Sequence, residues 1–233
     1  FPTVMDGVTL DELQIAWSEG TPPALFHGRP LLMEESTRAA LTELWDEPSA
    51  GAVRVVPADQ LLETAWSELP SWAIIPFESL DPKWKVLTVD GQSPVGKNFD
   101  LSTYPLVVPF TLQSPTGLQS LHLPSSNYDP SKLTTVVMTG VTALVRATAF
   151  TMELKGSTYP GQRIRDLMRE ADIAHICNEI PFYTGCTFPK PNQVALVFCS
   201  DPKYMDLLID IGADVIELTG NHFADRGAAG MRE

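Results

Sequence analysis

The sequence predicts an α/β protein built from two α/β units. Short apolar segments alternate with amphipathic segments of helical period, which is typical of strands and helices that form a largely parallel sheet. Hydrophobic residues make up 44% of the 233 residues and charged residues 19%, as in globular rather than disordered proteins. Residues 113–131 are rich in Ser, Pro, Gly and Asn and have the composition of a linker. We therefore expect one unit over residues 1–112 and a second over residues 132–233.

The first unit is expected to contain three helices and three strands. Thr9 and Glu12 have the spacing of a capping box, which favours a helix that begins directly after Thr9. An Asp90-Gly91 turn is expected to end the last strand. The helices are predicted at residues 9–19, 35–45 and 58–68, and the strands at residues 53–56, 72–77 and 84–89. The tryptophans predicted to pack in the core of this unit, rather than to bind a sugar, are Trp17, Trp45, Trp66, Trp72 and Trp84.

The second unit shows a regular alternation of strands and helices. Pro160 suits the first turn of a helix, and Gly156 and Gly212 suit helix ends. The strands are predicted at residues 134–140, 173–177, 194–199 and 215–218, and the helices at residues 142–155, 160–170 and 202–211. Ligands of parallel α/β sheets bind at the carboxyl ends of the strands, so the residues at those ends are the candidates for a site.

The net charge of -13 is concentrated in the first half of the chain. Residues 1–112 carry 6 basic and 16 acidic side chains, whereas residues 113–233 carry 10 and 13. Such a surface repels phosphate backbones, which argues against a nucleic-acid partner, and it also suits simple solubility. The sequence shows no apolar run long enough to span a membrane and no signal peptide.

The three cysteines are too few and too widely spaced for a zinc knuckle or a disulfide framework. Three buried thiols are the favoured interpretation of Cys177, Cys186 and Cys199. A Cys177–Cys186 disulfide is the alternative if the protein is exported.

Polar residues follow three of the predicted strands in the second unit. Gly140 and Val141 end the first strand, with Arg146 shortly after, and Glu179 follows the second. The last strand leads into Asn221 and His222. In a parallel sheet these segments meet at one edge, where Glu, Asn and His side chains can bind a divalent metal.

The segment Gly212 to His222, followed by Asp225 and Gly227, resembles a motif of the bacterial capsule-synthesis family: a small-residue turn, a strand, Asn-His and Asp-x-Gly. The strand that ends near Glu179, and Gly140 with Arg146, match two further motifs of that family. Its members are linked to the synthesis or attachment of poly-γ-glutamate capsules, and their fold resembles the α/β sandwich of dinuclear metallophosphatases. The resemblance covers residues 130–233 and implies the first part of such a sandwich.

The resemblance implies Glu179, Asn221 and His222 as ligands of a divalent metal such as Mn, Zn or Mg. It also implies catalytic roles for Asn221 and His222 and binding roles for Arg146 and Asp225. Two positions depart from the family pattern. Val141 stands where the family has a ligand Asp, and Cys177 stands where it has an Asn, for which Asn178 is the nearest substitute.

Simpler interpretations of the same residues stay open. His222 also suits a structural histidine, Asn221 a turn cap and Glu179 a solvated loop carboxylate. Arg146 also suits a pair with a helix carboxylate, and His175 suits the core. A Cys177–His222 nucleophile pair is a further, minor alternative.

The first unit has a weaker resemblance to one lobe of the type 2 periplasmic solute-binding proteins. It is carried by residues 8–20, by Trp72 to Leu80 and by Tyr104-Pro105-Leu106. The alternative is a generic α/β accessory domain. We expect the chain to be part of a longer polypeptide.

Together these patterns predict an extracytoplasmic protein, secreted or on the cell surface, that acts in the biosynthesis of a cell-envelope or capsule polymer. Its expected partners are that polymer or a small anionic ligand, and a second copy of the chain is expected to pair with an exposed sheet edge. A non-catalytic module for surface binding or assembly is the alternative to a metal-dependent hydrolase.

Overall fold

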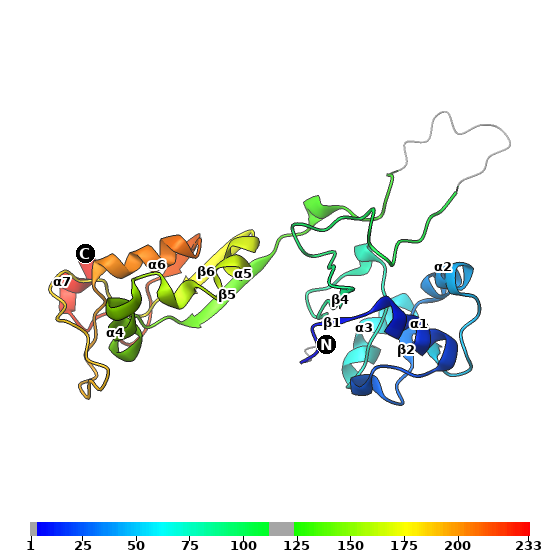
Figure 1. Cartoon of the computed structure of the whole chain (residues 1–233), viewed down its shortest axis with the longest axis horizontal. Coiled ribbons are helices and arrows are strands. Elements are labelled where there is room, and N and C mark those ends of the chain that lie inside the picture. The colour runs from blue at the N-terminus through cyan, green and yellow to red at the C-terminus, as the bar shows by residue number, and fades with distance from the viewer. Residues whose placement is uncertain (1–3, 112–123) are drawn as a thin grey trace. The chain divides into compact units, whose positions relative to one another are not determined.

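The structure, a computed structural model, describes residues 4–111 and 124–233. The chain divides into two compact units, Phe1–Lys132 and Leu133–Glu233 (Figure 1). The first part of the predicted linker lies outside the described residues. The remainder belongs to the first unit, where the ring of Tyr128 contacts Phe77 and Phe99 edge-on at centroid distances of 4.8 and 4.9 Å.

The first unit has two small parallel sheets of two strands each, one formed by β1 and β4 and the other by β2 and β3. The capping box that the sequence predicts is formed, because the Thr9 hydroxyl accepts from the Glu12 N–H at 3.1 Å and the Glu12 carboxylate accepts from the Thr9 N–H at 2.8 Å. The strands are β1 (Gly7–Val8), β2 (Leu31–Met33), β3 (Val53–Val55) and β4 (Thr88–Val89), and the helices are α1 (Leu10–Glu19), α2 (Glu35–Trp45) and α3 (Ala58–Ser67).

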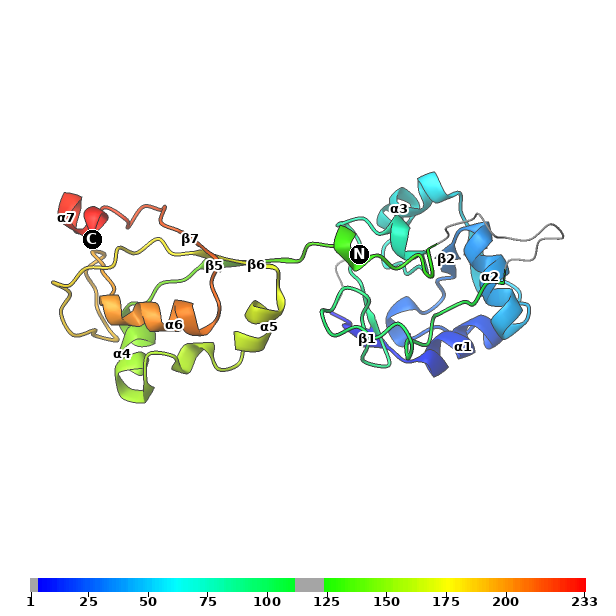
Figure 2. The same cartoon turned by 90° about the horizontal axis from the view of Figure 1, so that it is seen from above.

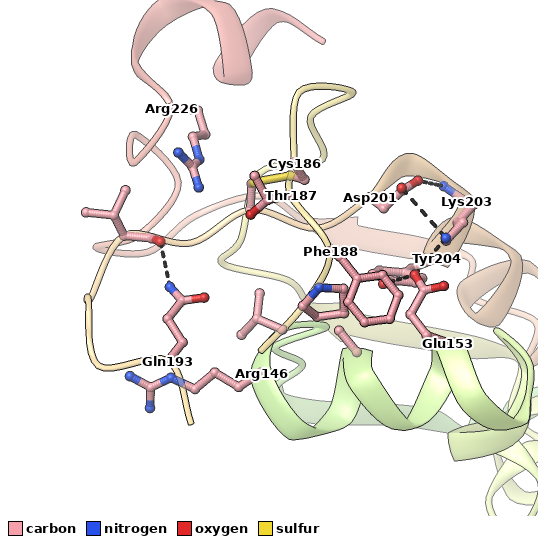
Figure 3. Close-up of a pocket in the computed structure, with 15 residues that line it drawn as sticks. Arg146, Glu153, Cys186, Thr187, Phe188, Gln193, Asp201, Lys203, Tyr204 and Arg226 are labelled. Carbon is pink, nitrogen blue, oxygen red and sulfur yellow. Dashed lines mark hydrogen bonds and ion pairs between the residues drawn. A yellow bond between two sulfur atoms is a disulfide. The ribbon is translucent and has the colours of Figure 1, made fainter. Parts of the chain in front are cut away.

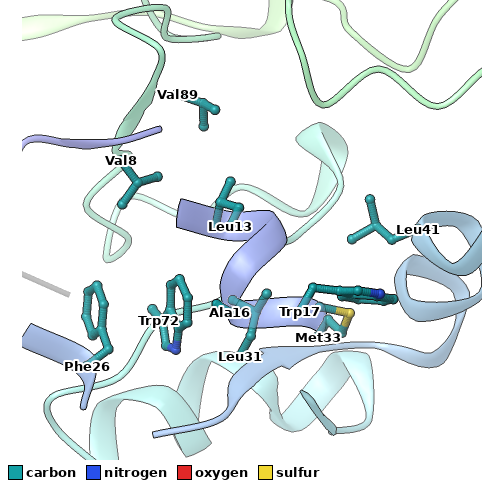
Figure 4. Close-up of a cluster of buried hydrophobic side chains, with 10 residues drawn as sticks. All are labelled: Val8, Leu13, Ala16, Trp17, Phe26, Leu31, Met33, Leu41, Trp72 and Val89. Carbon is teal, nitrogen blue, oxygen red and sulfur yellow. The ribbon is translucent and has the colours of Figure 1, made fainter. Parts of the chain in front are cut away.

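The core of the first unit forms where α1 meets β2 and α2 (Figure 4). Trp17 is 1% exposed, contacts Trp45 edge-on at 5.5 Å, and donates from its indole N–H to the Asp46 carbonyl at 2.9 Å. Phe26 and Trp72 stack with their ring centroids 5.0 Å apart. The aromatic side chains therefore pack as predicted, except that Trp66 on α3 is 38% exposed.

Two predicted strands of the first unit are largely absent. Over residues 72–77 only Ala73 forms a bridge, to Leu32, and the chain then turns after Pro76 into a short 3-10 helix. Proline has no N–H to continue a ladder, which explains the early end. Of residues 84–89 only Thr88 and Val89 pair as a strand. The Asp90-Gly91 turn is present, with both residues at positive φ.

The second unit is built on a three-stranded parallel sheet in the order β5-β6-β7. Figure 2 shows α4, α5 and α6 on one side of these strands. The strands are β5 (Val136–Val141), β6 (Ile173–Cys177) and β7 (Val215–Glu217), and the helices are α4 (Arg146–Lys155), α5 (Arg165–Glu170), α6 (Met205–Asp210) and α7 (Gly227–Arg232).

The two faces of this sheet differ. On β6, Ala174 and Ile176 are fully buried in the core that the helices cover, while Ile173, at the start of the strand, is 38% exposed. On the edge strand β5, Val136 and Met138 are 53% and 69% exposed. The alternation has the period of two that strands require. Pairing with a second copy of the chain stays a prediction.

Three predictions for the second unit need correction. Residues 194–199 form no strand, because the Gln193 amide donates to the carbonyls of Ala195 and Val197 at 2.9 and 3.0 Å and holds this segment as a loop. The helices expected at residues 160–170 and 202–211 each begin with a separate 3-10 turn. The helix α7 was not predicted. None of the helices in the described ranges combines the length and the apolar character that a membrane span requires.

Candidate functional site

The carboxyl ends of the three parallel strands lie next to one another. Val141 pairs with Cys177, and Cys177 pairs with Glu217. The segments that follow are joined by backbone hydrogen bonds, from the Thr142 N–H to the Cys177 carbonyl and from the Asn178 N–H to the Glu217 carbonyl, both at 2.8 Å. The candidate residues of the second unit therefore follow strands that all end at the same side of the sheet, at the carboxyl ends of β5, β6 and β7.

A histidine–aspartate pair follows the last strand. The Nδ1 of His222 lies 2.8 Å from Oδ2 of Asp225, and both side chains are largely buried. An ionised carboxylate only accepts hydrogen bonds, so Nδ1 carries the proton. When the imidazole carries only this proton, its lone pair is on Nε2, where it can bind a metal.

Phe198 joins this pair to the start of α4. Its backbone N–H donates to the same Oδ2 of Asp225 at 2.7 Å, and its ring meets the His222 imidazole edge-on at 4.7 Å. The Arg146 guanidinium lies over the same Phe198 ring, 4.8 Å from the ring centre, in a cation–π contact. Three predicted site residues thus gather around an aromatic residue that the sequence placed in a strand.

The other predicted site residues have different surroundings. Glu179 packs against Gly220, where an added Cβ would stand 2.4 Å from the Glu179 Cβ, so only glycine fits. Asn221 is exposed. Asn178, the alternative ligand, is fully buried and donates to the Ile180 carbonyl at 2.8 Å, which shapes the turn after β6.

The free thiol of Cys177 is not prepared for nucleophilic chemistry. Burial, and then the negative charges of Glu217 and Glu179, raise the pKa of the Cys177 thiol. The thiol is therefore kept protonated, whereas a nucleophile must be a thiolate. His175 is 21% exposed and thus only partly in the core, with its Nδ1 buried and its Nε2 3.8 Å from the Glu217 carboxylate.

The side chains at this edge do not by themselves fit a metal centre. Within residues 4–111 and 124–233, no group of three or more His, Cys, Asp and Glu side chains is placed to hold a metal ion. Val141 stands at the end of β5 with no donor atom, and the carboxylate of Asp225 is engaged by His222 and Phe198. Of the predicted ligand set, only the Nε2 of His222 is oriented by a neighbouring carboxylate.

A disulfide lies beside the cluster, so the predictions of three free thiols and of a Cys177–Cys186 bridge are both wrong. Cys186 and Cys199 are bridged, with their Cα atoms 5.9 Å apart, and Cys177 is free. The bridge, the loop between its two cysteines and the first turn of α4 line a cavity of about 150 Å³ (Figure 3). Arg146 and Arg226 line the same cavity, one residue from α4 and one from the start of α7.

The acidic groups of this cavity are already paired. Glu153 accepts from Lys203 and from the Tyr204 hydroxyl, both at 2.6 Å. The hydrogen bond from Lys203, followed by that from Tyr204, lowers the pKa of Glu153. Burial and the contact with Glu153 raise the pKa of Tyr204. Glu153 therefore stays ionised within a local network and does not neutralise the two arginines.

Comparison with protein families identifies the segment that carries this site. Residues 135–233 match the family model of the bacterial capsule synthesis protein PGA_cap. The match confirms the resemblance predicted from the Asn221-His222 segment and covers β5 to α7. It does not extend into the first unit, whose likeness to a solute-binding lobe stays a prediction. Neither the curated proteins nor the solved structures gave a match.

Proposed function

We propose that this protein acts in the biosynthesis or surface attachment of an anionic capsule polymer of the poly-γ-glutamate type. The observation that carries the proposal is the PGA_cap match over residues 135–233, the segment that contains His222, Asp225 and Arg146. The match relates this segment to capsule synthesis. The choice of a poly-γ-glutamate polymer rests on the family resemblance and on the cationic groups near the strand ends.

We place the protein outside the cytoplasm. Stable disulfides form in oxidising compartments, so the Cys186–Cys199 bridge supports a secreted or surface location. A test is to isolate the protein from intact cells with thiols blocked and to measure its free cysteines. A single free thiol, at Cys177, is expected, whereas three free thiols would contradict this location.

Within this function, the second unit is proposed to bind the polymer rather than to cleave it. A metallophosphatase-like hydrolase needs several anionic or imidazole ligands around its metal. The described residues bring no such group together, and Val141 occupies the end of the first strand. The arginines near His222 instead suit the carboxylates of a polymer.

A metal-dependent hydrolase is the second candidate, and one observation favours it. Asp225 fixes the imidazole of His222 through Nδ1, as carboxylates do for metal-ligating histidines, and leaves Nε2 for a metal. Glu179 and Asn221 would be the other ligands of a Mn, Zn or Mg ion held at this edge. Such a metal would supply an activated water for hydrolysis.

Metal analysis of the purified full chain separates the two candidates. The protein is dialysed against Mn, Zn or Mg, and bound metal is measured in the wild type and in His222→Ala. His27→Ala, a substitution in the first unit, is the control. Equal, substoichiometric metal in all three proteins is expected for a binding module. One metal per chain that disappears only in His222→Ala would establish the hydrolase form instead.

A further inference from the structure

The cavity beside the Cys186–Cys199 bridge has an unbalanced positive charge. Its lining contains three cationic side chains, Arg146, Lys203 and Arg226. Lys203 lies 2.6 Å from the Glu153 carboxylate and 3.9 Å from that of Asp201, the two acidic residues of the lining. The lining therefore has one net positive charge, and neither arginine forms an ion pair with a described carboxylate.

Both guanidinium groups also lack a hydrogen-bond acceptor at Nε. The Nε atoms of Arg146 and Arg226 are buried, and neither has a hydrogen-bond partner among the described residues. An unsatisfied buried donor is costly, and for arginine the fitting acceptor is a carboxylate that pairs side-on with Nε and Nη. Because both arginines also line the cavity and have no carboxylate partner among the described residues, it contains two separate guanidinium groups that can each pair with a carboxylate.

The structure holds each arginine in place by a different contact. The Arg146 guanidinium is stacked on Phe198, and the first turn of α4 around it contains no acidic residue. The stem of Arg226 lies over Gly230, where an added Cβ would be 2.5 Å from the Arg226 Cβ. In Figure 3, Arg226 extends from the top of the view and Arg146 from α4 at the bottom. Side chains that are fixed before binding lose less entropy on binding.

The disulfide completes the cavity. Cys186 and Cys199 close a loop whose residues Phe188, Gln193 and Val197 form one wall. Phe198, which carries Arg146 on its ring, directly precedes Cys199. The position of Arg146 is therefore coupled to the bridge.

We propose that this cavity binds a flexible chain with several carboxylates, and that Arg146 and Arg226 each hold one of them. Resting on the proposed function, this inference names the ligand class and the residues that recognise it. A single carboxylate satisfies one guanidinium, whereas a γ-linked oligoglutamate presents a carboxylate on every residue. Residues 113–233 carry 10 basic and 13 acidic side chains, so this half of the chain has no general attraction for a polyanion and the two arginines have to provide it locally.

The test measures binding of a short fluorescent γ-linked oligoglutamate to the full-length protein by anisotropy. Arg226→Gln removes one guanidinium and is expected to weaken binding about tenfold, the usual size of a lost charge-assisted hydrogen bond. Arg226→Lys keeps the charge without the planar fork and should recover only part of the loss. Arg232→Gln makes the same charge change on the exposed end of α7 and should bind like the wild type.

The competing ligands decide the chemistry. Oligoglutamine should not compete, and monomeric glutamate and inorganic phosphate should compete only weakly. Monomeric glutamate or phosphate that competes as well as the oligomer would overturn the claim of several carboxylates. Tight binding that Arg226→Gln leaves unchanged would overturn this site while the proposed function stands. If neither the oligomer nor, in co-sedimentation, the full-length polymer binds, both the proposed site and the proposed function are overturned.

Discussion

Removal of the Cys186–Cys199 bridge should destabilise the second unit and leave the first unit unchanged. The bridge joins cysteines 13 positions apart, with their Cα atoms at 5.9 Å, within the range of native disulfides. By restricting the unfolded chain, a loop of this length contributes about 3 kcal/mol to the free energy of unfolding. In a unit of roughly a hundred residues, this corresponds to a melting temperature lower by about 10–20 °C.

The distribution of tryptophan makes the assay selective. All five tryptophans lie before residue 85, so tryptophan fluorescence follows only the first unit, while calorimetry follows both. Both cysteines should be replaced by serine together, because a single replacement leaves a thiol that can pair with Cys177. Cys177→Ser is the control, since this thiol is not bridged.

We expect the double variant to lower one calorimetric transition and to leave the fluorescence transition in place. A calorimetric profile identical to that of the wild type would refute the loop-closure argument. An equal shift of the fluorescence transition would refute the assignment of the bridge's effect to the second unit alone.

Three further substitutions test the fold. Thr9→Ala removes the capping-box hydrogen bond and should lower the stability of the first unit by about 1 kcal/mol in a urea titration followed by fluorescence, with Thr9→Ser close to the wild type. Gly220→Ala should destabilise the second unit by about 1–3 kcal/mol in calorimetry, because its Cβ would meet that of Glu179; a fully stable variant would contradict this close approach. Hydrogen bonds from Lys203 and then Tyr204 hold the pKa of the Glu153 carboxyl below its ordinary value. The stabilisation that this carboxylate provides is therefore present above that ordinary value and is lost as the pH falls through the lowered pKa. Glu153→Gln should thus cost about 1 kcal/mol at neutral pH, and its unfolding curve should merge with that of the wild type in acid; a gap that persists in acid would count against this account.

Local sequence signals predict the elements that local interactions form. The capping box at Thr9 fixes the start of α1, and the short apolar segment at residues 173–177 predicts β6. By contrast β2, at Leu31–Met33, is too short for any period and exists because it pairs with β3. The predicted strand at residues 194–199 has suitable residues, but Val194 is 89% exposed and no strand within the described ranges pairs with this segment.

Long-range contacts explain what the sequence does not predict at the site. The strand-end rule indicates Arg146, His222 and Asp225, which the fold brings together. Phe198, around which they gather, belongs to no motif, and its role depends on a backbone contact with Asp225, 27 residues away. The pairing of Cys186 with Cys199 also depends on the folded structure, because three cysteines allow several pairings.

The contact between Phe198 and Asp225 gives the site an internal reporter. One oxygen of Asp225 accepts both the Phe198 amide proton and the Nδ1 proton of His222. When the loop around Phe198 moves away from Asp225, that amide is released to solvent and its hydrogen exchanges for deuterium. The exchange rate of this single amide therefore reports how often the Asp225 carboxylate is held in the position from which it orients the imidazole.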